Sequence, residues 1–146
     1  MRARRIASVT IAALVALTGA ACTAASPAPA PAGSAAAASE PAFGATLDAQ
    51  QFAASIEPGV TVLDARTPEE FAAGHLEGAV LADINGDFEA AVAGLDRSAP
   101  YAVYCRSGNR SAAALAAMQD LGFTDAWHLG GGIGAWQAAG LEVVTG

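Results

Sequence analysis

The chain has 146 residues, of which 53% are hydrophobic, enough to form one domain of ordinary size around a packed core. Seven arginines and no lysine face fourteen carboxylates, which gives a formal net charge of −7. This composition excludes disorder throughout the chain, and its acidity argues against nucleic acid or an anionic membrane surface as a partner.

Residues 1–22 are predicted to be a secretory signal. Three arginines within the first five positions precede an apolar stretch of twelve residues, which is shorter than the ~20 residues that span a bilayer as a helix. Small residues then lead into Cys22 and resemble the lipobox of bacterial lipoproteins, although Gly19 stands where that motif prefers a large aliphatic residue. We expect an exported protein, held on the extracytoplasmic side of the cell envelope by an acylated Cys22. A soluble secreted or periplasmic product is the alternative.

Residues 23–44 are predicted to be a disordered tether between this signal and a single domain at residues 45–146. The segment is rich in alanine and proline, contains almost nothing that can pack, and favours extended backbone. It would hold the domain away from a membrane. The sequence shows no internal repeat and no second domain.

From about residue 46 onward, short apolar strands alternate with helical segments. A first helix is expected to be capped by Thr46 and to stop at Pro58. A second helix begins at a capping box of Thr67 and Glu70 and ends near Gly74. The other expected helices are residues 87–95, 110–121 and 133–139, and the expected strands are residues 60–64, 79–82, 101–104 and 127–129. This alternation predicts an α/β fold whose parallel sheet is covered by helices on both faces.

Cys105 lies where a predicted strand ends and a helix begins, at the edge where an open α/β sheet binds its ligands. Gly108 and Asn109 both tolerate positive φ, so successive backbone N–H groups of this loop can turn inward around an anion. These donors and the helix dipole would lower the pKa of Cys105 and favour its nucleophilic thiolate, and they would also stabilise an anionic persulfide. The alternative is a buried structural cysteine, which the polar flanking residues and an oxidising compartment disfavour.

Four segments together resemble the rhodanese homology domain over roughly residues 45–145. They are residues 63–71 (LDARTPEEF), 74–79 (GHLEGA), 104–111 (YCRSGNRS), and 129–131 (LGG) with Ala135 and Trp136. Each is weak alone, but they occur in the family's order and spacing, with Glu77 standing where many members have proline. The resemblance implies a five-stranded parallel sheet and a sulfurtransferase. Its donor would carry sulfane sulfur, as thiosulfate, persulfides and polysulfides do, and its acceptor would be cyanide or a thiol on a small molecule or a protein.

We expect Cys105 to be the catalytic residue and to carry the sulfur as a persulfide. The loop residues expected to bind the substrate are Arg106, Ser107, Gly108, Asn109 and Arg110. The residues expected to support the site are Asp64, Arg66 and Ser111. We expect no cofactor and no metal site, because two separated histidines and one free cysteine do not make a ligand set.

Several neighbouring residues have two interpretations. Arg110 is either a loop brace paired with Asp64, which we favour, or a substrate contact. Arg106 either attracts an anionic donor or is a solvated surface residue. His75 follows a glycine at a turn and is interpreted as structural, and His128 lies far in sequence from other ligand types.

The same loop permits other functions. Cysteine phosphatases need five residues between cysteine and arginine, whereas this loop has four, so we disfavour phosphatase or arsenate reductase activity. The main alternative to the enzyme is a non-enzymatic persulfide carrier or redox-sensing module in the cell envelope. A purely structural envelope domain would require an unreactive Cys105.

Overall fold

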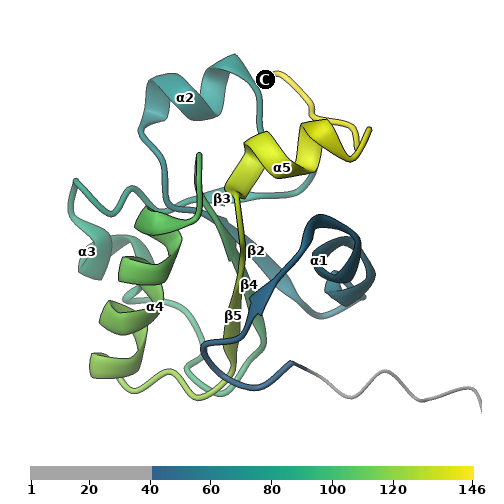
Figure 1. The fold of residues 1–146 in the computed structure, drawn as a ribbon. Coiled ribbons are helices and arrows are strands. Elements are labelled where there is room, and N and C mark those ends of the chain that lie inside the picture. Colours follow the sequence, from purple (N-terminus) through teal and green to yellow (C-terminus); the bar gives the residue numbers. More distant parts are fainter. Residues whose placement is uncertain (1–40) are drawn as a thin grey trace, which may run out of the picture. The chain divides into compact units, whose positions relative to one another are not determined.

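The computed structural model describes residues 41–146, which contain a five-stranded sheet flanked by helices (Figure 1). The predicted signal, residues 23–40 of the predicted tether, and Cys22 lie outside the described residues. All strand pairs are parallel, and the strand order is β1-β5-β4-β2-β3. The strands are β1 (Thr46–Leu47), β2 (Thr61–Asp64), β3 (Val80–Leu81), β4 (Tyr101–Tyr104) and β5 (Ala126–Leu129). The helices are α1 (Ala49–Ser55), α2 (Pro68–Ala73), α3 (Phe88–Val92), α4 (Asn109–Asp120) and α5 (Gly132–Ala138). The expected fold is confirmed.

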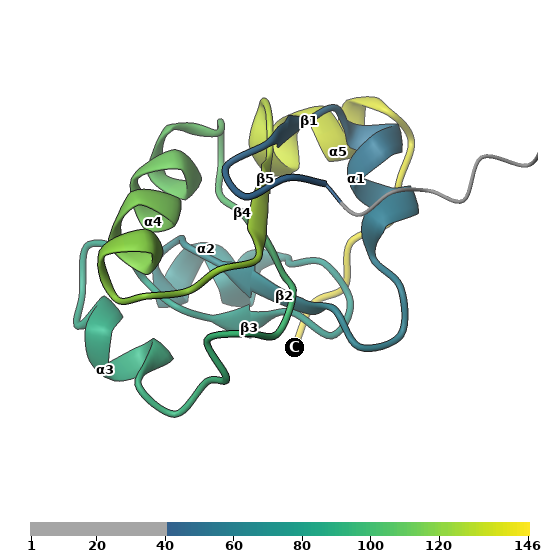
Figure 2. The same ribbon diagram turned by 90° about the horizontal axis from the view of Figure 1, so that it is seen from below.

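Helices cover both faces of the sheet, and its central strands are therefore buried on both sides. In β4, Tyr101 and Val103 join one apolar cluster, whereas Ala102 and Tyr104 join a second, as the two-residue period of a strand requires. The first cluster includes side chains of α3 and α4, and the second includes side chains of α1 and α5. These two pairs of helices lie on opposite sides of the sheet in Figures 1 and 2. The residue that follows β4 is therefore held in place by a strand that is packed on both faces.

The start of the domain differs from the prediction, because Thr46 does not cap a helix. Thr46 and Leu47 form the edge strand β1, which pairs with β5. The cap of α1 is Asp48, whose carboxylate accepts the Gln51 N–H at 2.9 Å, while the Gln51 amide oxygen accepts the Asp48 N–H at 3.1 Å. Two residues are too few for the alternation of a strand to show in the sequence, so β1 was missed.

The predicted capping box at the start of α2 is present. Thr67 Oγ1 accepts the Glu70 N–H at 3.3 Å, and Glu70 Oε2 accepts the Thr67 N–H at 3.4 Å. The helix ends at its cap Gly74, as expected. By contrast, α3 is shorter than the expected residues 87–95, and α4 begins one residue early, at Asn109.

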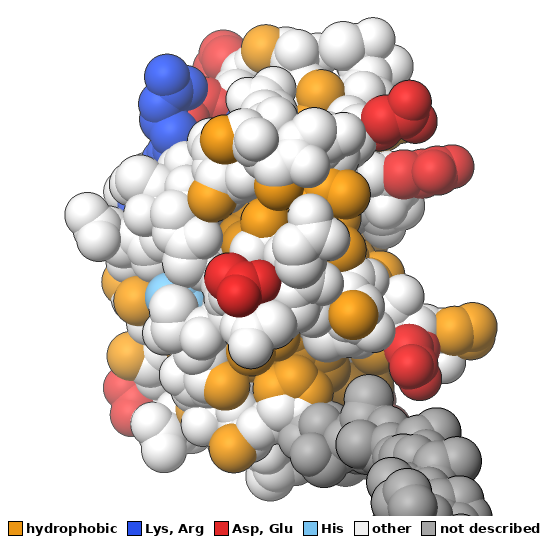
Figure 3. Space-filling view, turned by 45° about the vertical axis from the view of Figure 1, so that its right-hand side comes forward, with side chains coloured by type: hydrophobic (Ala, Val, Ile, Leu, Met, Phe, Trp, Pro, Cys, Tyr) orange, Lys and Arg blue, Asp and Glu red, His pale blue; other side chains and the backbone are white. Residues whose placement is uncertain are grey.

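Figure 3 views the molecule from the side of α1 and α5, where hydrophobic side chains reach the surface between polar ones. A hollow of about 500 Å³ beside α1 is lined largely by apolar residues, among them Leu47, Val60 and Trp127. None of its lining residues belongs to the loop that follows β4, so this hollow is separate from the predicted site. Among residues 41–146, no helix combines the length and the apolar character needed to cross a membrane.

Candidate active site

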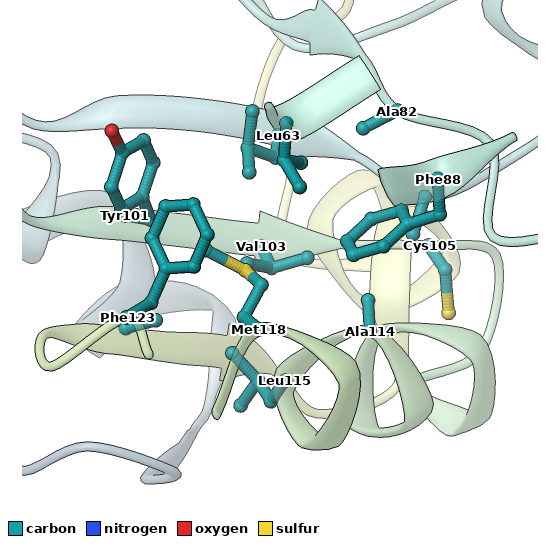
Figure 4. Close-up of a cluster of buried hydrophobic side chains, with 13 residues drawn as sticks. Leu63, Ala82, Phe88, Tyr101, Val103, Cys105, Ala114, Leu115, Met118 and Phe123 are labelled. Atoms are coloured by element: carbon teal, nitrogen blue, oxygen red, sulfur yellow. The ribbon is translucent and has the colours of Figure 1, made fainter. Parts of the chain in front are cut away.

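Cys105 follows the last residue of β4, and its side chain is fully buried. It belongs to the apolar cluster under α3 and α4, together with Phe88 and Ala114. Figure 4 shows its sulfur at the edge of this cluster, on the side away from Met118 and Phe123. One side of the sulfur therefore faces hydrocarbon, and its other neighbours are the polar groups of the loop.

The loop between β4 and α4 directs hydrogen-bond donors at this sulfur. The Gly108 N–H donates to Cys105 Sγ at 3.1 Å. Burial by itself raises the pKa of Cys105, but this effect is outweighed by the polar groups near the sulfur, which are the Ser111 hydroxyl and the N–H groups of Ser111, Ser107 and Gly108. The net effect lowers the pKa and favours the thiolate, which is the nucleophilic form of cysteine.

The loop can turn its N–H groups inward because its carbonyl groups are bound from outside. The Ile133 N–H donates to Cys105 O at 2.8 Å, and the Gly134 N–H donates to Arg106 O at 3.4 Å, so the first turn of α5 holds the outer side of the loop. Gly108 takes the left-handed φ of +99° that this shape requires. Asn109, which we expected to share that role, is instead the first residue of α4.

A hydrogen-bonded row of side chains lies behind the loop. Ser111 Oγ donates to Gly108 O at 3.0 Å and lies 3.0 Å from His128 Nδ1. His128 Nε2 lies 2.9 Å from Thr46 Oγ1. Burial lowers the pKa of His128, so its ring is neutral at neutral pH. Sequence reasoning missed this residue, because only the pairing of β5 with β4 brings His128 beside α4.

Asp64 and Arg66 form a buried ion pair next to the site. Arg66 Nε and Nη2 donate to the Asp64 carboxylate at 2.9 and 2.6 Å, and Nη2 also donates to Gly74 O at 2.7 Å. The Tyr104 hydroxyl donates to the same carboxylate at 2.5 Å. Burial and this hydrogen bond raise the pKa of Tyr104, so its phenol stays protonated. Both oxygens of the buried Asp64 carboxylate, at the end of β2, thus accept hydrogen bonds.

Arg110 is a brace, but its partner differs from the one we predicted. Its two terminal nitrogens donate to the Glu70 carboxylate at 2.6 and 2.9 Å, whereas Asp64 is taken by Arg66. The Arg110 guanidinium lowers the pKa of Glu70 to about 2. This bidentate pair ties the first turn of α4 to α2.

Arg106 points outward from the loop. Its side chain is 74% exposed, and its contact with Glu70 is long, at 3.9 Å. Such an exposed pair contributes little to stability and leaves the guanidinium free to meet a solute. Arg106 also lines a hollow of about 350 Å³ between the loop, α2 and α5, together with Arg66, Glu70 and Ile133.

The remaining predicted residues are placed as follows. Ser107 and Asn109 are exposed at the loop surface, and Ser111 is buried. His75 stacks on the Phe71 ring at 3.8 Å and bonds Phe71 O through Nδ1 at 3.0 Å, a structural arrangement. Within residues 41–146, no group of three histidine, cysteine or acidic side chains lies close enough together to hold a metal ion.

Comparisons with known proteins show the family and the fold of the chain. The family model of the rhodanese-like domain matches residues 48–139. The chain is 38% identical over 88 residues to the thiosulfate sulfurtransferase GlpE of Pseudomonas fluorescens, covering 60% of this chain and 80% of GlpE. It is 38% identical over 104 residues to the probable adenylyltransferase/sulfurtransferase MoeZ of Mycobacterium tuberculosis, and this match covers 68% of the chain but only 26% of MoeZ. The crystal structure of a rhodanese-related protein from Thermoplasma volcanium superposes with a TM-score of 0.59 at 31% identity, over 70% of this chain and 99% of that one.

Proposed function

The chain belongs to the rhodanese-like domain family, and from that premise we propose that it is a sulfurtransferase that carries sulfane sulfur as a persulfide on Cys105. The observation that carries this proposal is one buried sulfur at the start of the loop, which accepts the Gly108 N–H at 3.1 Å and whose pKa the polar groups of the loop lower. A donor set that stabilises a thiolate also stabilises the terminal anion of a persulfide. The similarity to thiosulfate sulfurtransferase GlpE supports the same chemistry.

The proposed cycle has two displacements at sulfur. The Cys105 thiolate attacks the outer sulfur of thiosulfate, a new S–S bond forms, and the old S–S bond breaks so that its electron pair leaves with sulfite. An acceptor thiolate or cyanide then attacks the outer sulfur of the persulfide, and the electron pair of the broken bond returns to Cys105. A persulfide or polysulfide donor follows the same steps with a different leaving group. Both displacements begin and end with an anionic sulfur on Cys105, held in the same loop.

The other site residues have separate proposed roles. Arg106 attracts anionic donors to the loop mouth, since its guanidinium is exposed beside the hollow that borders the loop. Arg110 fixes the start of α4 against α2 through its ion pair with Glu70. Asp64 and Arg66 support the loop from β2 as a buried pair.

We also propose that the protein is exported and acylated on Cys22. The support is the basic start, the apolar stretch and the small residues before Cys22 in the sequence. The wild type is expected to sediment with membranes after expression in a bacterial host, whereas Cys22→Ser is expected to be released. Equal release of the two proteins would contradict the lipid anchor.

Mass spectrometry tests the sulfur chemistry. After exposure to thiosulfate or polysulfide, the peptide that contains Cys105 is expected to gain ~32 Da, because one sulfur atom is added to a nucleophilic thiolate. The Cys105→Ser protein, treated in parallel, is the control and is expected to show no gain at this peptide. If several donors leave the wild-type peptide unchanged, the proposed mechanism is wrong.

One observation favours a second function, that of a persulfide carrier. Cys105 is fully buried, so in this second function a partner protein opens the loop to discharge the persulfide. Continuous turnover of thiosulfate with cyanide by the purified protein would favour the enzyme. A single round of persulfide formation, discharged only when a partner protein is added, would favour the carrier.

A further inference from the structure

The carboxylate of Glu70 lies between the two arginines that flank the loop of Cys105. Its Oε1 is 2.9 Å from Arg110 Nη2 and 3.9 Å from Arg106 Nη1, and its Oε2 is 2.6 Å from Arg110 Nη1. Arg106 directly follows Cys105, and Arg110 lies in the first turn of α4. One negative group of the chain itself therefore occupies the place where both cations of the loop converge.

The contact between Glu70 and Arg110 is one that a guanidinium also offers to oxyanions from solution. Two parallel N–H···O bonds join the side chains, the arrangement that arginine forms with carboxylate and phosphate groups alike. The sulfonate end of thiosulfate presents its oxygens as acceptors in the same way. Glu70 thus holds, before any donor binds, the place that Arg110 would offer to an anionic donor.

Solutes can reach this ion pair. The side chains of Arg110 and Glu70 are 26% and 24% exposed, and Glu70 lines the hollow of about 350 Å³ beside the loop together with Arg106. Ion pairs within reach of water are weak, because solvent screens the charges and can replace either partner. A doubly charged solute in this hollow can therefore compete with Glu70 for the arginines.

Glu70 has a second partner that keeps it in place after such an exchange. Its Oε2 also accepts the Thr67 N–H, within the capping box that begins α2. This bond is 3.4 Å long, whereas an N–H···O bond is usually about 2.9 Å, so Arg110 holds the carboxylate more closely than the cap does. When another anion binds Arg110, the carboxylate can move closer to the Thr67 N–H and remain on α2.

We infer that Glu70 is a specificity-determining residue: it competes with anionic donors for Arg106 and Arg110, and a donor must displace it to bind there. A donor with two negative charges, such as thiosulfate, displaces Glu70 more readily than a donor with one charge, because its attraction to two guanidinium groups is larger. For thiosulfate this inference rests on the proposed function. The competition itself is a property of the loop that other anions also test.

The test compares the alkylation of Cys105 by two reagents of nearly equal size, neutral iodoacetamide and anionic iodoacetate. Rates on the Cys105 peptide of the full-length protein are measured across pH by mass spectrometry, and the midpoint of each profile reports the acidity of the thiol. Both reagents react with the same thiolate by displacing iodide, so the ratio of the iodoacetate rate to the iodoacetamide rate cancels the thiolate fraction. Glu70→Gln is expected to raise this ratio about fivefold, the effect of one unit charge at about 4 Å in water.

Glu69→Gln is the matched control, because Glu69 precedes Glu70 in α2 and lines the same hollow. Glu69 forms no ion pair with a residue in the described part of the chain, so this variant removes the same charge without releasing an arginine. It is expected to change the ratio less than about twofold, since an exposed charge is screened. Equal ratios in the two variants, or a wild-type ratio in Glu70→Gln, would overturn the inference.

A measurement on the wild type keeps the inference testable if Glu70→Gln does not fold. The variant is expected to fold, because glutamine also serves in capping boxes and its amide oxygen can accept from Arg110. In the wild type, sulfate is a dianion that carries no sulfane sulfur. Its addition is expected to shift the carboxyl ¹³C NMR resonance of Glu70 as this side chain loses Arg110. A resonance that stays unmoved at every sulfate concentration would contradict the displacement.

Sulfur transfer gives a separate measurement. With thiosulfate as the donor, Glu70→Gln is expected to lower the KM about fivefold, because the donor no longer displaces a charged group. An unchanged KM would refute the inference for thiosulfate. The alkylation and NMR measurements use no sulfur donor, so a protein that shows the expected ratios but forms no persulfide would contradict the proposed function and leave the role of Glu70 standing.

Discussion

Replacing Gly132 by alanine is expected to lower the free energy of unfolding by about 3 kcal/mol or more and to disorganise the loop around Cys105. Gly132 has a φ of +59°, and an added Cβ would lie 2.3 Å from Cys105 O and 2.4 Å from Arg106 C. Both of these atoms belong to the backbone, so no side-chain rotation can relieve the overlap. Urea unfolding followed by tryptophan fluorescence measures the loss.

Gly134→Ala is the matched control, because it places the same methyl group two residues further along α5. There the Cβ would lie 3.6 Å from Arg106 O, an ordinary contact, and alanine is the better helix former. This variant is expected to keep the wild-type stability or to gain up to ~1 kcal/mol. Gly132→Ala is also expected to raise the pH midpoint of Cys105 alkylation, since the loop amides lose their alignment. Wild-type stability together with a wild-type midpoint in Gly132→Ala would refute the view that α5 shapes the loop.

The features that sequence reasoning predicted correctly are those encoded by neighbouring residues. The capping box of Thr67 and Glu70 is a three-residue pattern, and it occurs in the structure at the start of α2. The placement of Cys105 followed from an apolar strand that stops at a glycine-containing loop. In both cases the residues that determine the structure lie within one helical turn or one loop of each other. Their interactions can therefore be predicted from residues that are close in the sequence.

The features that were missed depend on which segments meet across the fold. Arg110 had carboxylates available at both Asp64 and Glu70 by sequence alone, and the choice between them follows from Arg66. Arg66 lies two residues from Asp64 and occupies that carboxylate with its own guanidinium. Arg110 is left with Glu70, which α2 presents to the start of α4.

The position of His128 could not be predicted for a similar reason. Its side chain meets Ser111 because β5 pairs with β4, and it meets Thr46 because β1 pairs with the other edge of β5. The strand β1 has only two residues, which is too short to recognise from its pattern. A histidine with no partner in the sequence thus gains two in the fold.

Asp64→Ala is expected to cost about 3–5 kcal/mol of unfolding free energy, because it leaves the guanidinium of Arg66 buried without its carboxylate. Arg66 is 3% exposed and Asp64 is fully buried, so water cannot replace the lost partner without opening the site. The Tyr104 hydroxyl, which donates to Asp64 at 2.5 Å, loses its acceptor in the same step. Urea unfolding of the variant beside the wild type measures the cost.

A double variant, Asp64→Leu with Arg66→Met, separates the effect of the charges from that of the space they fill. Both ions are gone and apolar side chains occupy their volume, so the double variant is expected to be more stable than Asp64→Ala. Sulfur transfer is not expected to recover with stability, because Arg66 also holds Gly74 O at the end of α2, and α2 presents Glu70 to Arg110. A double variant less stable than Asp64→Ala would show that the pair adds stability of its own, beyond sparing the core an unpaired charge.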